Sequence, residues 1–292
     1  MKPAAFEYHR VGTTAEAVAV LDQLGEEGRV LAGGQSLVPL MNFRLAQPEH
    51  LVDINGVGEL AYVRRDDGML ALGATARQAQ VAAAEPSRTD VPLLVEALGF
   101  VAHPPIRHRG TVVGSIAHAD PAAELPSVAV ACHASLTLTS RGGSRDVAAE
   151  EFFLGPFETL LAPGELVTEV RFPPSAPGAG WAFVEFARRH GDFAIAGAAV
   201  TLALDGDRVA DASIVLCAVG PRPVRAERAE ALLLGQAPDA ELVAEAAERA
   251  VAGLTPGADI HGGTEYRVGV ARVQVRRAIA LALERARGGD RR

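Results

Sequence analysis

Short helices and strands are predicted for the first part of the chain by its pattern of apolar and polar positions. Apolar residues recur at helical period behind the Thr-x-x-Glu spacing of residues 13–16, which predicts a first helix that ends near Gly25. A short helix is expected over residues 37–41 and another from Thr75. Apolar runs predict strands at residues 30–31, 50–54 and 69–73. The spacing is shorter than in a Rossmann sheet, so a mixed α and β domain is expected.

A run rich in proline and glycine, residues 173–180, divides the chain and is typical of a linker. Before it, apolar runs predict strands at residues 128–139 and 166–172. Beyond it, we expect two helices preceded by strands at residues 181–186, 194–204 and 212–219. The pattern predicts an α+β fold with two domains, residues 1–176 and 177–288, and a frayed tail at residues 289–292.

Composition narrows the classes of function. The formal net charge is -8 and no basic stripe occurs, which argues against a nucleic-acid partner. The N-terminus lacks the apolar region of a signal peptide and no stretch has membrane-spanning length, so a cytoplasmic protein is expected. The two cysteines, Cys132 and Cys217, each lie in an apolar, strand-like run, as buried thiols do in a reducing compartment. Two thiolates are too few for an iron–sulfur cluster or a cysteine zinc site held by this chain alone.

A Gly-Gly pair follows the strand expected at residues 30–31. Glycine tolerates positive φ and has no Cβ to hold a ligand away, so such a turn can direct backbone N–H groups at a phosphate. An ordinary turn has the same local pattern, and the pair alone does not distinguish the two. The candidate anion site comprises Ala32, Gly33, Gly34, Gln35 and Ser36.

A second stretch repeats this chemistry, with glycines and hydroxyl side chains around a short apolar run. Its members are Thr111, Val112, Val113, Gly114 and Ser115. Two such turns can hold the two ends of a pyrophosphate, while Asp120 or Glu124 accepts hydrogen bonds from sugar hydroxyls. The alternative is a surface β-turn with a solvated aspartate.

Histidines are frequent near this stretch, but their spacings match no metal signature, and no metal site is expected. They are His103, His108, His118 and His133. The charged segment at residues 188–192 fits either a contact with another molecule or a solvated hairpin turn.

With both glycine turns, the chain resembles the FAD-binding medium subunit of the molybdenum hydroxylases, the family of carbon monoxide, xanthine and aldehyde dehydrogenases. The resemblance rests on the two turns, on Phe-Glu-Tyr at residues 6–8, on Leu-Val-Asp-Ile at 51–54, on Ala-His-Ala-Asp-Pro-Ala at 117–122, and on Arg-Arg-His-Gly-Asp-Phe-Ala at 188–194. Tyr266-Arg267 before a long helix matches as well. These segments occur in the family's order from one end of the chain to the other.

The resemblance implies an N-terminal FAD-binding domain of the vanillyl-alcohol-oxidase type, made of two α+β subdomains, and a C-terminal three-stranded sheet with helices. It implies that both turns hold the FAD pyrophosphate, that Asp120 and Glu124 approach FAD hydroxyls or adenine, and that Leu161 lies against the isoalloxazine ring. No catalytic acid or base is expected. The implied partners are a molybdenum-cofactor large subunit and a 2Fe-2S small subunit, in a dimer of heterotrimers.

Two positions depart from the family pattern. Val113 stands where a glycine is expected, and a β-branched residue at positive φ would cost about 1–3 kcal/mol. His108 replaces an asparagine, whose hydrogen bond a neutral histidine can supply. We expect an electron-transfer subunit that passes electrons from iron–sulfur clusters through FAD to an acceptor. The alternatives are a degenerate paralogue that acts as an assembly or nucleotide-binding module, motivated by Val113, and a stand-alone flavin oxidase.

Overall fold

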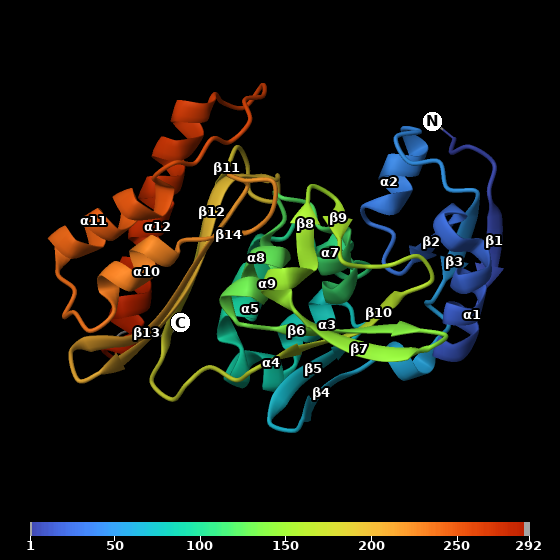
Figure 1. The fold of residues 1–292 in the computed structure, drawn as a ribbon, viewed down its shortest axis with the longest axis horizontal. Coiled ribbons are helices and arrows are strands. Elements are labelled where there is room, and N and C mark those ends of the chain that lie inside the picture. Colours follow the sequence, from blue (N-terminus) through green and yellow to red (C-terminus); the bar gives the residue numbers. More distant parts are fainter. Residues whose placement is uncertain (1, 289–292) are drawn as a thin grey trace.

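The computed structural model describes residues 2–288, which fold into three lobes in a row (Figure 1). We call them the N-terminal lobe (residues 2–57), the central lobe (residues 58–179) and the C-terminal lobe (residues 180–288). The tail expected at residues 289–292 lies outside the described residues. The α+β class predicted from the sequence is confirmed.

The N-terminal lobe is a small parallel sheet in the order β1-β3-β2 with helices around it. Its elements are β1 (Glu7–Arg10), α1 (Thr14–Leu24), η1 (Gly25–Glu27), β2 (Gly28–Leu31), α2 (Leu37–Asn42) and β3 (His50–Asp53). Thr13 caps α1 as predicted, because its hydroxyl accepts from the Glu16 N–H at 3.1 Å. The Glu16 carboxylate accepts from the N–H of Gly12 at 2.8 Å, one residue earlier than in a standard capping box.

The central lobe is built on an antiparallel sheet in the order β4-β5-β10-β6-β7. Its first elements in chain order are η2 (Gly58–Leu60), β4 (Val63–Asp66), β5 (Met69–Gly73), α3 (Gln78–Ala83), α4 (Glu85–Asp90), α5 (Pro92–Phe100), α6 (Pro104–Arg107), α7 (Val112–His118), α8 (Glu124–Ala131) and β6 (Ser135–Ser140). Then come β7 (Gly143–Ala148), α9 (Ala149–Phe152), β8 (Phe153–Gly155), β9 (Glu158–Thr159) and β10 (Leu166–Phe172). Helix α7 packs against β5 and β10, and α1 packs against β6 and β10, so one apolar core joins the first two lobes.

The prediction of a strand over residues 128–139 is wrong for residues 128–131, which form the end of α8. Every residue of α8 is buried, so the segment has no polar face from which a helical period could be read. Cys132 accordingly lies at the end of a helix rather than in a strand, and burial raises the pKa of its thiol to about 12. The helix expected from Thr75 begins later, at Gln78.

The C-terminal lobe contains the three expected strands and a short fourth one, in the order β11-β12-β13-β14. Its elements are β11 (Gly180–Ala187), β12 (Ala194–Asp205), β13 (Arg208–Cys217), β14 (Val224–Arg225), α10 (Glu227–Leu233), α11 (Ala240–Val251) and α12 (Thr264–Ala286). Helices α10 and α12 pack on one face of the sheet, and α5 and α8 of the central lobe cover the other (Figure 1). Both faces are thereby buried, which explains the long apolar run of β12. Within residues 2–288, no helix combines the length and apolarity needed to cross a membrane.

An ion pair joins the C-terminal lobe to the central lobe. Arg285 of α12 donates to both carboxylate oxygens of Glu96 on α5, at 2.9 and 3.0 Å. It also donates to the carbonyl oxygen of Trp181 at 2.7 Å, and its guanidinium lies over the indole ring. The Arg285 side chain is only 6% exposed, so the pair is largely shielded from solvent screening.

Candidate functional site

 The structure brings the two glycine turns into direct contact, although Gly33 and Gly110 lie 77 positions apart in the sequence and belong to different lobes. A Cβ placed on Gly33 would lie 2.6 Å from the carbonyl oxygen of Arg109 and 2.7 Å from the Cα of Gly110. Only glycine permits this approach of the two backbones, so Gly33 is the point at which the turns meet.

The first turn presents open backbone donors. Gly34 has a φ of +71°, which turns the chain between β2 and α2, and the side-chain amide of Gln35 donates to the Gly33 carbonyl at 2.9 Å. The N–H groups of residues 33–36 donate to no acceptor within residues 2–288. Consecutive backbone donors in such a turn form a concave binding site for an anion.

The second stretch is the start of a helix, not a surface β-turn. The Thr111 hydroxyl caps α7 by accepting from the Gly114 N–H at 3.0 Å, and the Ser115 N–H donates to the Thr111 carbonyl at 3.2 Å. The Val112 N–H donates to the carbonyl of Ala76 at 3.3 Å. Of this stretch, the N–H groups of Thr111 and Val113 have no acceptor in the described part of the chain.

Val113 is unstrained in this arrangement. It lies within α7, is not among the residues with positive φ, and its side chain is buried in the core. A glycine is therefore not required here for backbone reasons, and the cost expected for a β-branched residue at positive φ does not arise. His108 lies at the end of α6, where its backbone N–H donates to the carbonyl of Pro104 at 3.0 Å.

Two side chains that the sequence did not single out tie the turns together. Arg77 donates to the Arg109 carbonyl at 2.6 Å and to the side-chain oxygen of Asn55 at 2.5 Å. Asn55 in turn donates to the carbonyl of Ala32 at 2.8 Å. Burial, and then the nearby Arg109 guanidinium, lower the pKa of Arg77. An anion at the junction would offset this repulsion, so the donors and the charges present fit a pyrophosphate.

The remaining predicted residues lie beyond this junction. Asp120 follows α7, and its carboxylate accepts from the Ala122 N–H at 2.9 Å. Glu124 begins α8 and is 7% exposed, and burial first and the Asp120 carboxylate next raise its pKa to about 7. Both residues follow the C-terminal end of α7, whose seven residues span about 10 Å from the junction of the turns. Leu161 lies between β9 and β10, half-buried against the core.

A buried acidic cluster adjoins Glu124 and was not anticipated from the sequence. Glu185 on β11 pairs with Gly197 on β12, which pairs with Cys217 on β13. A Cβ on Gly197 would lie 2.7 Å from the Cys217 sulfur and 3.1 Å from the Glu185 Cβ. The side chains of Cys217 and Glu185 therefore occupy the space beside this glycine. Burial, followed by the neighbouring Glu124 carboxylate, raises the pKa of Glu185 to about 8.

This cluster predicts that the protein loses stability as the pH rises. Both glutamates have folded-state pKa values above the ordinary value of 4.5, so the folded chain binds more protons than the unfolded chain. The free energy of unfolding should fall between about pH 4.5 and about pH 8. We expect Glu185→Gln to flatten this slope and to gain about 2 kcal/mol at pH 8, after allowance for partial exposure.

Urea unfolding at pH 5 and at pH 8 measures this effect. Glu284→Gln, at an exposed position of α12, serves as the matched control and should retain the wild-type slope. An unchanged slope in Glu185→Gln would show that Glu185 is ionised at neutral pH in the folded protein.

Two known families match the chain in succession. Residues 4–175 match the family described as the FAD binding domain in molybdopterin dehydrogenase. Residues 181–282 match the family described as the CO dehydrogenase flavoprotein C-terminal domain. Together these matches span the three lobes.

Relatives of known function are similar over nearly the whole chain. The 6-hydroxypseudooxynicotine dehydrogenase complex subunit alpha of Paenarthrobacter nicotinovorans is 42% identical over 98% of this chain and 97% of its own length. The carbon monoxide dehydrogenase medium chain of Hydrogenophaga pseudoflava is 40% identical, with 98% and 99% covered. A solved structure of carbon monoxide dehydrogenase from Hydrogenophaga pseudoflava, lacking the Mo-pyranopterin moiety, matches with a TM-score of 0.96 at 41% identity and covers 98% of this chain and 99% of that one. The chain therefore belongs to the family of FAD-binding flavoprotein subunits of molybdopterin dehydrogenases, which are oxidoreductases, and its cofactor is FAD.

Proposed function

We propose that this protein is the electron-transfer flavoprotein subunit of a molybdenum hydroxylase, passing electrons from iron–sulfur clusters on a partner subunit to an acceptor. The observation that carries the proposal is the contact of Gly33 with the backbone of Arg109 and Gly110, which sets two groups of open N–H donors side by side. Bound FAD would supply the redox chemistry, while the chain binds and orients it.

The proposed roles of the chain's residues divide by position. The pyrophosphate would be held by Ala32, Gly33, Gly34, Gln35, Ser36, Thr111, Val112, Val113, Gly114 and Ser115, in part through their backbone N–H groups. Arg77 and Asn55 would keep the two turns at this distance and are positioning residues. Asp120 and Glu124 are assigned to FAD hydroxyls or adenine, and Leu161 to the isoalloxazine ring.

The proposed partners are a molybdenum-cofactor large subunit and a 2Fe-2S small subunit, assembled as a dimer of heterotrimers in the cytoplasm. The support is that similar proteins are named as subunits or medium chains of dehydrogenases. The two cysteines are buried or half-buried and unbridged, which suits a chain that relies on a partner for its iron–sulfur clusters. We propose the domain boundary between residues 176 and 177.

The test combines FAD titration with assembly. The isolated chain, followed by calorimetry, should bind one FAD, and the co-expressed complex should contain iron and molybdenum. Anaerobic addition of a substrate of the complex, screened from carbon monoxide and N-heterocycles, should then bleach the flavin absorbance. A chain that binds FAD but neither co-purifies with such subunits nor is bleached would refute the electron-transfer role.

A degenerate paralogue without useful FAD binding was motivated by strain at Val113. Because Val113 lies unstrained in α7, no specific observation favours that alternative.

A further inference from the structure

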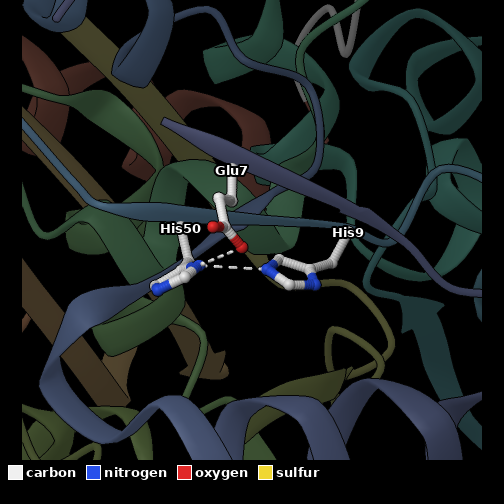
Figure 2. Close-up of side chains that lie close together, drawn as sticks. All are labelled: Glu7, His9 and His50. Atoms are coloured by element: carbon white, nitrogen blue, oxygen red, sulfur yellow. Dashed lines mark hydrogen bonds and ion pairs between the residues drawn. The ribbon is translucent and has the colours of Figure 1, made fainter. Parts of the chain in front are cut away.

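Three side chains with metal-binding atoms converge on the sheet of the N-terminal lobe, outside the FAD site. They are Glu7 and His9 of β1 and His50 of β3, and Figure 2 shows all three directed toward one point. Glu7 and His50 are register partners on neighbouring parallel strands. His9 lies two residues beyond Glu7, so its side chain emerges on the same face of the sheet.

The distances among these groups suit a small coordination sphere. Nε2 of His9 lies 3.1 Å from Nδ1 of His50, and that Nδ1 lies 3.6 Å from a carboxylate oxygen of Glu7. The three ligand atoms all lie within 4.8 Å of one another. Ligands about 2.0–2.1 Å from a tetrahedral ion are separated by about 3.3 Å, which is close to these values.

The surroundings of the cluster favour a cation. Glu27 and Glu49 also have ligand atoms within 4.8 Å of His50, so three carboxylates surround one imidazole. The Glu7 side chain is 75% exposed and the His50 side chain 18%, which leaves the cluster open to an ion from solvent while one ligand is held by packing. Bringing two imidazole nitrogens face to face requires a shared proton or a shared ion between them.

We propose that Glu7, His9 and His50 form a binding site for a divalent transition-metal ion of the zinc class. Two imidazoles and a carboxylate suit Zn²⁺, whereas Mg²⁺ and Ca²⁺ prefer oxygen ligands alone. Water supplies the fourth ligand. The sequence analysis expected no metal site, because His9 and His50 are 41 positions apart and meet only through the pairing of β1 with β3.

The ion would fasten β1 to β3 at the end of the sheet opposite the FAD junction. Parallel strands begin at the same edge, and His50 begins β3, whereas Gly33 follows the end of β2. Metal binding should therefore raise the melting temperature and leave FAD affinity unchanged.

The experiment uses the untagged full chain, loaded with FAD, stripped of metal with EDTA and titrated with ZnCl2 by calorimetry. We expect one Zn²⁺ per chain, a higher melting temperature, and no uptake of Mg²⁺. His9→Gln, His50→Gln and the exposed Glu7→Gln should each weaken Zn²⁺ binding by about tenfold or more while FAD affinity stays at the wild-type value. Co²⁺ in place of Zn²⁺ should give visible absorption bands that change in the His9→Gln variant.

His261→Gln, at an exposed histidine of the C-terminal lobe, is the matched control and should bind Zn²⁺ like the wild type. Absence of stoichiometric Zn²⁺ uptake by the wild type overturns the proposal. Wild-type affinity in His9→Gln and His50→Gln overturns it as well, and would leave the pair as a hydrogen bond between two histidines beside Glu7.

Discussion

Gly33→Ala should weaken FAD binding by about a hundredfold or more, which corresponds to about 2.7 kcal/mol. The added methyl group would lie 2.6 Å from the Arg109 carbonyl oxygen and 2.7 Å from the Gly110 Cα. Both are backbone atoms, so no side chain can rotate away and the two turns must separate. Separation would displace the open N–H groups of one turn from those of the other, and the pyrophosphate could not contact both.

Calorimetric or fluorescence titration of the purified variant with FAD measures this loss. Gly99→Ala is the matched control, because a Cβ at this position of α5 meets no atom within 4 Å. It should bind FAD like the wild type and be slightly more stable, since alanine favours helix over glycine. Wild-type FAD affinity in Gly33→Ala would show that the contact of the turns is not what holds the cofactor.

Arg285→Met should lower the free energy of unfolding by about 3–5 kcal/mol. The substitution leaves the Glu96 carboxylate without the two hydrogen bonds that it accepts from the guanidinium. This contact lies between the central and C-terminal lobes and is mostly shielded from water. Methionine preserves much of the side-chain volume, so the cost reports the unpaired charge more than a cavity. The carbonyl of Trp181 also loses its donor.

Chemical denaturation at neutral pH gives this difference. Arg272→Met, on the same helix as Arg285, removes an exposed ion pair to Glu248 of α11 and should cost at most about 1 kcal/mol. Adding Glu96→Gln to Arg285→Met should recover part of the loss, because the isolated charge is removed. Equal losses of stability in Arg285→Met and Arg272→Met would show that the Arg285–Glu96 ion pair between the lobes contributes no more than an exposed pair.

The parts of the fold that follow local rules were predictable from the sequence. The cap of α1 at Thr13, the turn at Gly33-Gly34 and the strands of the C-terminal sheet each follow from residues close together in the chain. The irregular connection between β10 and β11 was recognisable in the same way, because proline and glycine interrupt regular structure locally.

The parts that depend on distant contacts were not predictable in this way. Helix α8 was misread because burial on all sides removes the polar positions that mark a helical period. Arg77 and Asn55 are ordinary polar residues in sequence, and their role arises only where two lobes meet. Glu185 reaches Cys217 across a glycine on the strand between them, so register rather than local pattern places them together.

The division of the proposed FAD junction between two lobes also has a consequence for the order of events during protein synthesis. Gly33 is made early, but the Thr111 stretch rests on a sheet whose central strand, β10, ends at Phe172. A nascent chain shorter than this contains one turn and lacks the support for the other. We therefore expect flavin binding to be a late step of maturation, which follows the joint folding of the first two lobes.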